Sequence, residues 1–344
     1  MIIRSVLFVI FSEMLKVING ENCTLFERNA ADIDNDMFEE IKDYADSGAF
    51  EALFNITAIE SIYHEFKSIK YNEDIDLNIT QLLYKYGYPA EQHEVQTSDG
   101  YLLNMFRIPN KGPVVFLMHG VFCSSDDYVT PGPDRGLAYL LADAGYDVWM
   151  GNARGTTHSR KHISLSPSCA EFWDFTWDEI GRYDLPVMID YALNSTNQEQ
   201  LIYIGHSQGP DITQINSTAL PVIFGHMPAG VATKQFIHFT QLVQSAKFRQ
   251  FDHGWRNIEK YGSTIPPDYP VEKITSPVAI FYSPNDWFGD IEDVEILIKK
   301  LPNLFKFVTV QYESFSHMDY LWARDVKELL YVDVLNVIEE YLNG

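Results

Sequence analysis

The sequence predicts an α/β fold in which a mostly parallel sheet carries helices on both faces. Three observations predict it: strand-type and helix-type segments alternate along the chain, several strands are continuous apolar runs, and one strand ends at a glycine-flanked serine. Alternating strands and helices build a parallel sheet through right-handed crossovers. Strands that are apolar throughout indicate that both faces of this sheet are buried.

The predicted elements follow one another from about residue 92 to the end of the chain. The first is a hairpin over about 92–108 that turns at Ser98-Asp99-Gly100. We then expect strands over 112–118, 146–150, 201–204, 277–283 and 306–312, and helices over 135–144, 184–193, 233–248, 290–300 and 326–342.

The most informative segment is the serine turn at residues 205–209, which read Gly-His-Ser-Gln-Gly after the apolar run 201–204. A strand that stops at a serine flanked by glycines forces that serine into a sharp turn, because a Cβ at either flank would clash. The turn lifts the Ser207 hydroxyl above the sheet edge, at the N-terminus of a helix. Ser207 is therefore a candidate nucleophile.

Two backbone amides are candidate donors to a developing oxyanion. The apolar strand 112–118 ends in His119-Gly120-Val121, and the turn after such a strand supplies one donor, here the N–H of Val121. The residue after the nucleophile supplies the second, the N–H of Gln208. Loss of one such donor typically costs about 2.7–4 kcal/mol of transition-state stabilisation. We interpret His119 itself as a hydrogen-bonded buried histidine without a role in proton transfer.

An acid and a base follow the serine in the order expected of a serine hydrolase. Asp286 comes directly after the apolar strand 277–283, and His317 lies in the loop after the strand 306–312. A serine hydroxyl needs a base, and the base needs a carboxylate that fixes its tautomer. We expect Asp286 to be that carboxylate, because Asp290 and Asp293 lie too far into the next helix.

Several long segments closely resemble the acid lipases, the family of gastric and lysosomal lipases and their invertebrate relatives. They are 86–93, 97–102, 107–109, 147–156 (DVWMGNARGT), 159–162, the tryptophan-rich 171–181 (EFWDFTWDEIG), 225–230 (GHMPAG) and 317–320 (HMDY). The resemblance covers about residues 76–344. It implies an α/β-hydrolase fold, a lipase or carboxylic ester hydrolase acting on acylglycerols or sterol esters, and the triad Ser207, Asp286 and His317.

The chain departs from the family pattern directly after the serine turn. Only residues 210–224 separate Gly209 from the block 225–230, which implies that roughly ninety residues of elbow helix, core strand and cap are absent. Residues 210–221 are a poor helix that Pro221 would end, and Leu220–Phe224 could serve as a substitute strand. We therefore expect a shortened cap and core at 210–230.

The net charge, the N-terminal segments and the glycosylation motifs indicate which partners and which cellular compartment to expect. The net charge of −23 argues against binding to nucleic acid or to anionic membranes. Residues 1–20 read as a secretory leader, residues 21–75 as an acidic extension or pro-segment, and 76–344 as the hydrolase domain, with no later transmembrane stretch. Candidate glycosylation sites at Asn22, Asn55, Asn78, Asn194 and Asn216 fit a secreted or lysosomal protein.

Metal and thiol chemistry are not expected. The three cysteines, Cys23, Cys123 and Cys169, cannot all pair within the chain. His158 and His162 have the spacing of a helical ligand pair but no third ligand nearby, so we expect no metal and no cofactor.

Three functional hypotheses remain open from the sequence. The chain is an active lipase-like esterase on lipid ester at a lipid–water interface, a catalytically impaired secreted lipid-binding relative, or a truncated splice or gene product. The complete set of triad residues favours the first, and the short segment after Gly209 favours the other two.

Overall fold

A computed structural model describes residues 72–206, 219–286 and 288–344. The predicted leader at 1–20 and all but the last residues of the predicted extension at 21–75 lie outside these ranges. Ser207 and Gln208 also lie outside them, as do Asn22, Asn55 and Asn216. Among the described residues, no helix is both long enough and apolar enough to cross a membrane.

The described chain begins with a short capped helix and the predicted hairpin. Asn78 caps α4 (Ile79–Lys85) by accepting the N–H of Gln81 at 3.0 Å. The hairpin consists of β1 (Glu91–Gln96) and β2 (Tyr101–Ile108), paired antiparallel with Glu91 opposite Arg107. Gly100 in its turn has φ of +102°, a conformation that glycine adopts without strain.

The main sheet has the order β1-β2-β4-β3-β6, and the short β5 (Lys161–His162) pairs with β2. β3 (Val114–Met118) lies parallel to both β4 (Asp147–Gly151) and β6 (Ile202–Gly205). All five residues of β3 and of β4 are buried, as their apolar sequences predicted. The sheet is mixed, because β2 pairs antiparallel with both β1 and β4.

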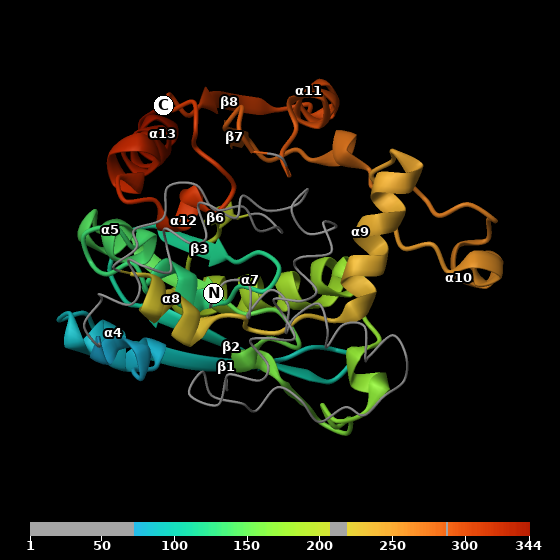
Figure 1. Ribbon diagram of the computed structural model, residues 1–344, viewed down its shortest axis with the longest axis horizontal. Helices are drawn as coiled ribbons and strands as arrows, with labels where there is room; N and C mark the ends of the chain where they lie inside the picture. Colours follow the sequence, from blue (N-terminus) through green and yellow to red (C-terminus); the bar gives the residue numbers. More distant parts are fainter. Residues whose placement is uncertain (1–71, 207–218, 287) are drawn as a thin grey trace, which may run out of the picture.

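Helices cover both faces of this sheet (Figure 1). Alternate residues of β3 enter two hydrophobic clusters, with Val115 and Leu117 in one and Val114 and Phe116 in the other. The first cluster includes α4, α5 (Leu137–Asp143), α12 (Asp319–Trp322) and α13 (Val332–Asn343). The second includes α7 (Leu185–Thr196). The alternation places one crossover helix on each face, as the sequence predicted.

The last two strands form a separate sheet in the described part of the chain. β7 (Val278–Tyr282) and β8 (Leu304–Thr309) pair in parallel, and α11 (Ile291–Lys300) connects them in the sequence. Figure 1 shows the three together at one end of the molecule. The single sheet that we predicted is therefore divided among the described residues. β6 is the last strand on its side of the main sheet there, and Tyr203 in β6 is 45% exposed.

One element prediction is wrong. Leu220–Phe224, proposed as a substitute strand, belongs to the helix α8 (Leu220–His226). Pro221 occupies the first turn of α8, where the missing N–H removes no intrahelical hydrogen bond. The weak helix considered over 210–221 lies almost wholly outside the described residues. α8 packs on the 3₁₀ turn η2 (Glu73–Ile75), because a Cβ on Gly225 would lie 2.9 Å from Ile75.

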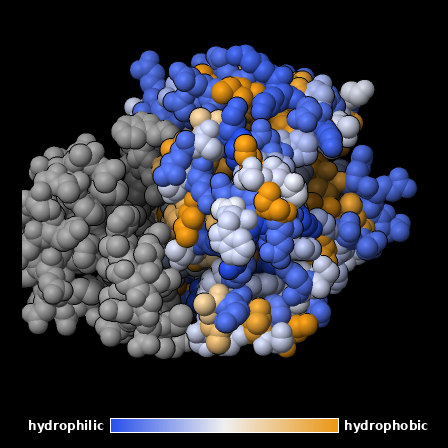
Figure 2. All heavy atoms as spheres, turned by 90° about the vertical axis from the view of Figure 1, so that its right-hand side faces the viewer, coloured by the Kyte–Doolittle hydropathy of each residue, from blue (hydrophilic) through white to orange (hydrophobic). Residues whose placement is uncertain are grey.

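Two further helices follow α8 and precede β7 in the sequence. α9 (Thr233–Ser245) and α10 (Asn257–Tyr261) extend from the right-hand side of Figure 1. Figure 2 views the molecule from that side and shows apolar groups interspersed with polar ones. The exposed apolar side chains of this region include Val243, Phe248 and Trp255, the last being 81% exposed.

Candidate active site

The loops after β3 and β6 meet at the edge of the main sheet where these parallel strands end. β6 stops at Gly205, and the N–H of His206 donates to the carbonyl of Met118 at 3.1 Å, which ties the end of β6 to the end of β3. Ser207 and Gln208, the predicted nucleophile and second oxyanion donor, directly follow His206 in the sequence and lie outside the described residues. The described part of the site consists of the residues around the serine turn.

Asp286 and His317 lie together, as their chain order predicted. The Nδ1 atom of His317 donates to Asp286 at 2.8 Å to Oδ1 and 2.9 Å to Oδ2. Their side chains are 3% and 8% exposed. A hydrogen bond at Nδ1 fixes the tautomer and leaves Nε2 as the nitrogen that can take a proton from a hydroxyl.

The Asp286 carboxylate is held ionised by its own loop. Its Oδ1 accepts the N–H groups of Phe288 at 2.9 Å and Gly289 at 3.1 Å. Burial raises the pKa of Asp286, but the hydrogen bond from His317 and these two amides outweigh burial and hold the pKa below its ordinary value. Asp290 instead caps α11 by accepting the N–H of Glu292, so it is not the partner of His317.

The sequence did not predict a role for His206. Its Nε2 donates to the carbonyl of His317 at 3.1 Å, and its ring lies 5.3 Å from the His317 ring. Burial lowers the pKa of His206 to about 3, so the ring is neutral over the working range of a hydrolase. Its place immediately before Ser207 was the only signal in the sequence. The contact links the end of the serine strand to the loop of the candidate base.

The predicted oxyanion turn is stabilised by His119. The His119 Nε2 accepts the N–H of Ala153 at 3.1 Å, so its Nδ1 carries the proton and donates to the Gly120 carbonyl at 2.7 Å. Burial lowers the pKa of His119 to about 4, which keeps it neutral. Phe122 in the same turn has φ of +60°, and its carbonyl accepts the N–H of Ala229 at 2.8 Å. These contacts fix the backbone on both sides of Val121.

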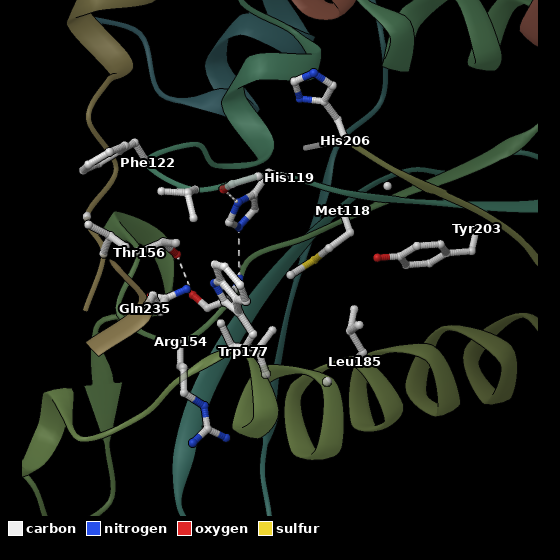
Figure 3. A pocket seen from close by; sticks show the side chains of 18 residues that line it. Met118, His119, Phe122, Arg154, Thr156, Trp177, Leu185, Tyr203, His206 and Gln235 are labelled. Atoms are coloured by element: carbon white, nitrogen blue, oxygen red, sulfur yellow. Dashed lines mark hydrogen bonds between the residues drawn. The ribbon is translucent and has the colours of Figure 1, made fainter. Parts of the chain in front are cut away.

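A cavity of about 230 Å³ opens beside this turn. Its walls come from the oxyanion turn, the ends of β3 and β6, the start of α9 and the helical segment 177–185 (Figure 3). The lining is largely apolar or aromatic and includes Met118, Val121, Phe122, Trp177, Ile180, Leu185 and Tyr203. In Figure 3 the Arg154 and His206 side chains point away from the other labelled side chains. The cavity therefore offers a mainly apolar surface next to the turn of Val121.

A buried carboxylate near the site is shared by two histidines. Asp126, in the 3₁₀ turn η3 (Ser125–Tyr128), accepts from His158 Nε2 at 2.6 Å and from His226 Nδ1 at 2.7 Å. His226 Nε2 also donates to the Asp74 carbonyl at 3.2 Å. Because both ring nitrogens of His226 face acceptors, its geometry matches the doubly protonated imidazolium. The cluster joins α8 and η2 to the loop after β3.

The protonated state of His226 makes the fold more stable at acidic pH. Burial lowers the pKa of His226, but the hydrogen bond and charge of Asp126 outweigh it, so the pKa is raised above its ordinary value. Burial also raises the pKa of the neighbouring Asp127 to about 7. A raised histidine pKa stabilises the fold below about pH 6.5, and this contribution is lost as the pH rises through the folded-state pKa.

We expect His226→Gln to destabilise the protein more at pH 5 than at pH 8. At pH 5 the variant loses a charged hydrogen bond, at a cost of roughly 1.5–3 kcal/mol in the free energy of unfolding. As the pH rises through the folded-state pKa of His226 the native histidine loses its proton, so the cost becomes smaller. Urea unfolding at both pH values measures the difference. His162→Gln, at a half-buried histidine that contacts the Asp99 carbonyl and not a carboxylate, is the control. A cost independent of pH would contradict the assignment.

The other sequence predictions have mixed outcomes. His158 and His162 contact different groups, since His158 contacts Asp126 whereas His162 contacts the Asp99 carbonyl. No cluster of three or more potential metal ligands occurs in the described part of the chain. Cys123 is buried, and burial holds the pKa of its thiol well above the ordinary value, which is unfavourable for a nucleophile. The candidate glycosylation residues Asn78 and Asn194 are both exposed.

Comparison with known proteins gives consistent results. Residues 79–132 match the family described as the partial α/β-hydrolase lipase region, and residues 113–210 match the α/β hydrolase fold. Lipase 1 of Drosophila melanogaster is 35% identical over 365 residues, covering 81% of this chain and 83% of the relative. The human gastric triacylglycerol lipase is 31% identical over 368 residues, covering 78% and 92%. The human lysosomal acid lipase/cholesteryl ester hydrolase is 30% identical over 369 residues, also covering 78% and 92%. The predicted α/β-hydrolase fold is confirmed.

Proposed function

Because this chain belongs to the acid lipase family of α/β-hydrolases, we propose that it hydrolyses carboxylic esters of acylglycerols or sterols through Ser207, Asp286 and His317. The observation that carries the proposal is the buried hydrogen bond from His317 to Asp286, at the sheet edge where β6 leads into the serine turn. An ionised carboxylate on Nδ1 prepares Nε2 to act as a base.

The proposed reaction proceeds through an acyl-enzyme. His317 takes the proton of the Ser207 hydroxyl as the oxygen attacks the ester carbonyl, and then gives it to the leaving alcohol. The N–H groups of Val121 and Gln208 donate to the oxyanion of the tetrahedral intermediate. Water then attacks the acyl-enzyme with His317 again as base, releasing the acid and restoring the serine.

The cavity beside Val121 is proposed to take the acyl chain of the ester. Its apolar lining and its place at the turn of the predicted oxyanion donor support this. Its volume of about 230 Å³ lies below the roughly 300–1,000 Å³ of pockets that enclose drug-sized ligands. The size favours short acyl chains.

We also propose that the segment after the serine turn is shortened relative to the family. The alignment with the Drosophila lipase spans 365 residues, whereas 81% of this 344-residue chain is about 279, so about 86 aligned positions have no residue of this chain. The match to the α/β hydrolase fold ends at residue 210. The separation of β6 from β7 among the described residues is consistent with a core strand missing between them.

The shortened segment keeps a second function open. In a lipid-binding relative that does not turn over its ligand, the cavity would remain but the serine would not be activated. The division of the described strands into two sheets favours this alternative, because the missing strand would sit between the serine strand and the strand before Asp286. A truncated splice or gene product would in addition fail to fold cooperatively.

A covalent serine probe separates these functions. We expect a fluorophosphonate to label the wild-type protein and not Ser207→Ala, because only an activated serine reacts readily. Labelling that persists in Ser207→Ala would exclude this nucleophile. A folded protein that binds fatty acid without reacting would support the lipid-binding alternative.

We expect short soluble esters to be better substrates than long-chain emulsified lipids. The small cavity and the shortened cap leave the distal part of a long chain without apolar contacts, so added methylenes gain little. For p-nitrophenyl esters, kcat/KM for the butyrate should exceed that for the laurate by about tenfold or more. Equal or higher rates on long-chain triacylglycerol would contradict the shortened cap.

The proposed location is the secretory pathway, either outside the cell or in the lysosome. The names of the gastric and lysosomal relatives, the apolar leader sequence and the exposed Asn78 and Asn194 support it. The contribution of His226 to stability below about pH 6.5 also suits an acidic compartment.

A further inference from the structure

One wall of the cavity is a helix with an irregular turn. The helical segment runs from α6 (Trp177–Glu179) through a π-turn (Ile180–Asp184) into α7. Within it the Leu185 N–H donates to the Ile180 carbonyl, five residues back. Pro186 follows directly and has no N–H for the Arg182 carbonyl, which accounts for the widened turn. The turn brings Ile180, Gly181 and Leu185 to the cavity wall.

Gly181 differs from Gly205 and Gly230, which also line the cavity, in the space around it. An added Cβ at Gly181 would meet no atom within 4 Å. A Cβ at Gly205 would lie 3.1 Å from the Tyr203 ring, and a Cβ at Gly230 would lie 2.5 Å from the Arg160 side chain. Packing therefore excludes a side chain at Gly230 and crowds one at Gly205, whereas it leaves room at Gly181.

The backbone does not require glycine at position 181 either. Gly181 lies in a helical segment and is absent from the residues with positive φ. Glycine in a helix is less stable than alanine, because it loses more conformational freedom on folding. Neither backbone conformation nor packing explains the glycine. Gly181 lines the cavity and is exposed, so its missing side chain leaves the cavity open at this point.

The wall on which Gly181 lies is rigid. The Trp177 ring stacks on the His238 ring with centroids 5.0 Å apart and an angle of 27°. His238 donates through Nε2 to the Arg249 carbonyl at 2.9 Å, and its ring packs edge-on against Phe251. Trp177 therefore cannot readily move aside for a larger ligand. The length of ligand that fits along this wall then depends on the free space at Gly181.

We propose that Gly181 is the position that sets the length of acyl chain the cavity accepts. This inference rests on the proposed function, because it assumes that the cavity receives the acyl group of the ester. The acyl chain extends from the turn of Val121 along Ile180 and Leu185 and passes over the bare backbone of Gly181. A side chain at position 181 projects into that path and shortens it.

The test is a series of substitutions of increasing size at one position. Gly181→Ala, Gly181→Leu and Gly181→Phe are compared with wild type on p-nitrophenyl acetate, butyrate, hexanoate, octanoate and laurate. We expect the preferred chain to become shorter as the side chain grows. In Gly181→Phe, kcat/KM for the octanoate relative to the acetate should fall by about tenfold or more, since one methylene in an apolar pocket changes the rate by roughly 10–200-fold.

The matched control is Ser195→Phe, which adds the same ring to an exposed position of the same helix. It should leave the chain-length profile unchanged. Gly181→Ala should raise the melting temperature, because alanine is more stable than glycine in a helix. Circular dichroism spectra and melting curves establish that each variant is folded.

Binding of 11-(dansylamino)undecanoic acid, followed by its fluorescence, separates the failure of this inference from the failure of the proposed function. Wild type should bind the probe, and Gly181→Phe should bind it about tenfold more weakly. If wild type hydrolyses esters but both the profile and the binding are unchanged in Gly181→Phe, the inference is overturned and the function stands. If no ester is hydrolysed but probe binding still depends on position 181, the function fails and the acyl site stands. If there is neither hydrolysis nor probe binding, both are overturned.

Discussion

Replacing His317 with alanine is expected to lower kcat by roughly 10⁴- to 10⁶-fold, the range seen when a serine hydrolase loses its base. His317 donates through Nδ1 to Asp286 and is 3% exposed, so bulk solvent has little access to act as the base in its place. Substrate binding should change little, because the imidazole is not among the groups that line the cavity. Steady-state kinetics on p-nitrophenyl butyrate give the loss in kcat separately from KM.

Asp286→Asn tests the same unit with less disturbance. The asparagine keeps the size of the side chain but cannot stabilise the cationic histidine, so we expect a loss of about 10⁴-fold in kcat. Asp290→Asn is the matched control, because Asp290 caps α11 and asparagine is an equally good cap. Full activity in His317→Ala, or equal losses in the two asparagine variants, would exclude Asp286 and His317 as the acid and base.

Asp286 and His317 could be predicted because chain order and topology constrain them. Each follows a strand, and the carboxyl ends of parallel strands meet at one edge of a sheet. Both residues lie where this rule puts them, within 2.8 Å of each other. The buried β3 and β4 could be predicted for a similar reason, since a continuous apolar run has no polar face to expose to water.

The contacts that support the site could not be predicted in this way. His206 contacts a carbonyl 111 residues away, and His226 contacts Asp126, 100 residues away. Such contacts depend on how loops pack in three dimensions, and a lone histidine in the sequence carries no sign of its partner. The identity of α8 also depended on packing, because Leu220–Phe224 is an apolar run too short for periodicity to separate strand from helix.

Removing Arg154 is expected to cause the largest loss of stability. The Arg154 side chain is buried and donates to Asp184 at 2.6 Å and 2.8 Å and to Asp99 at 2.6 Å and 3.0 Å. Its guanidinium also lies over the Tyr101 ring, 4.0 Å from the centroid. Asp184 has no exposed surface. Arg154→Met leaves this carboxylate buried without its cation, which typically costs about 3–5 kcal/mol in the free energy of unfolding.

The loss should depend on pH in a defined direction. Burial raises the pKa of Asp184 to about 6, because Arg154 offsets only part of the cost of burying the charge. A raised carboxyl pKa stabilises the fold below the ordinary value near 4, and that contribution is lost as pH rises. Without Arg154 the pKa rises further. At pH 5 the carboxyl is then neutral and the variant loses little more than hydrogen bonds, whereas at pH 7.5 it bears the full penalty.

Urea unfolding of Arg154→Met at pH 5 and pH 7.5 measures this difference. Adding Asp184→Asn to the variant removes the buried charge while keeping an acceptor for the Arg154 amide, which donates to Asp184 at 2.9 Å. The double variant should regain at least about 1 kcal/mol at pH 7.5. Lys161→Met breaks an exposed pair with Glu94 and should cost less than about 1 kcal/mol. If Arg154→Met costs no more than Lys161→Met, or if its cost is the same at both pH values, the buried Arg154–Asp184 pair does not stabilise the fold as proposed. Arg154 would then not be the residue that holds Asp99 of the hairpin turn to Asp184 of the helical segment 177–196.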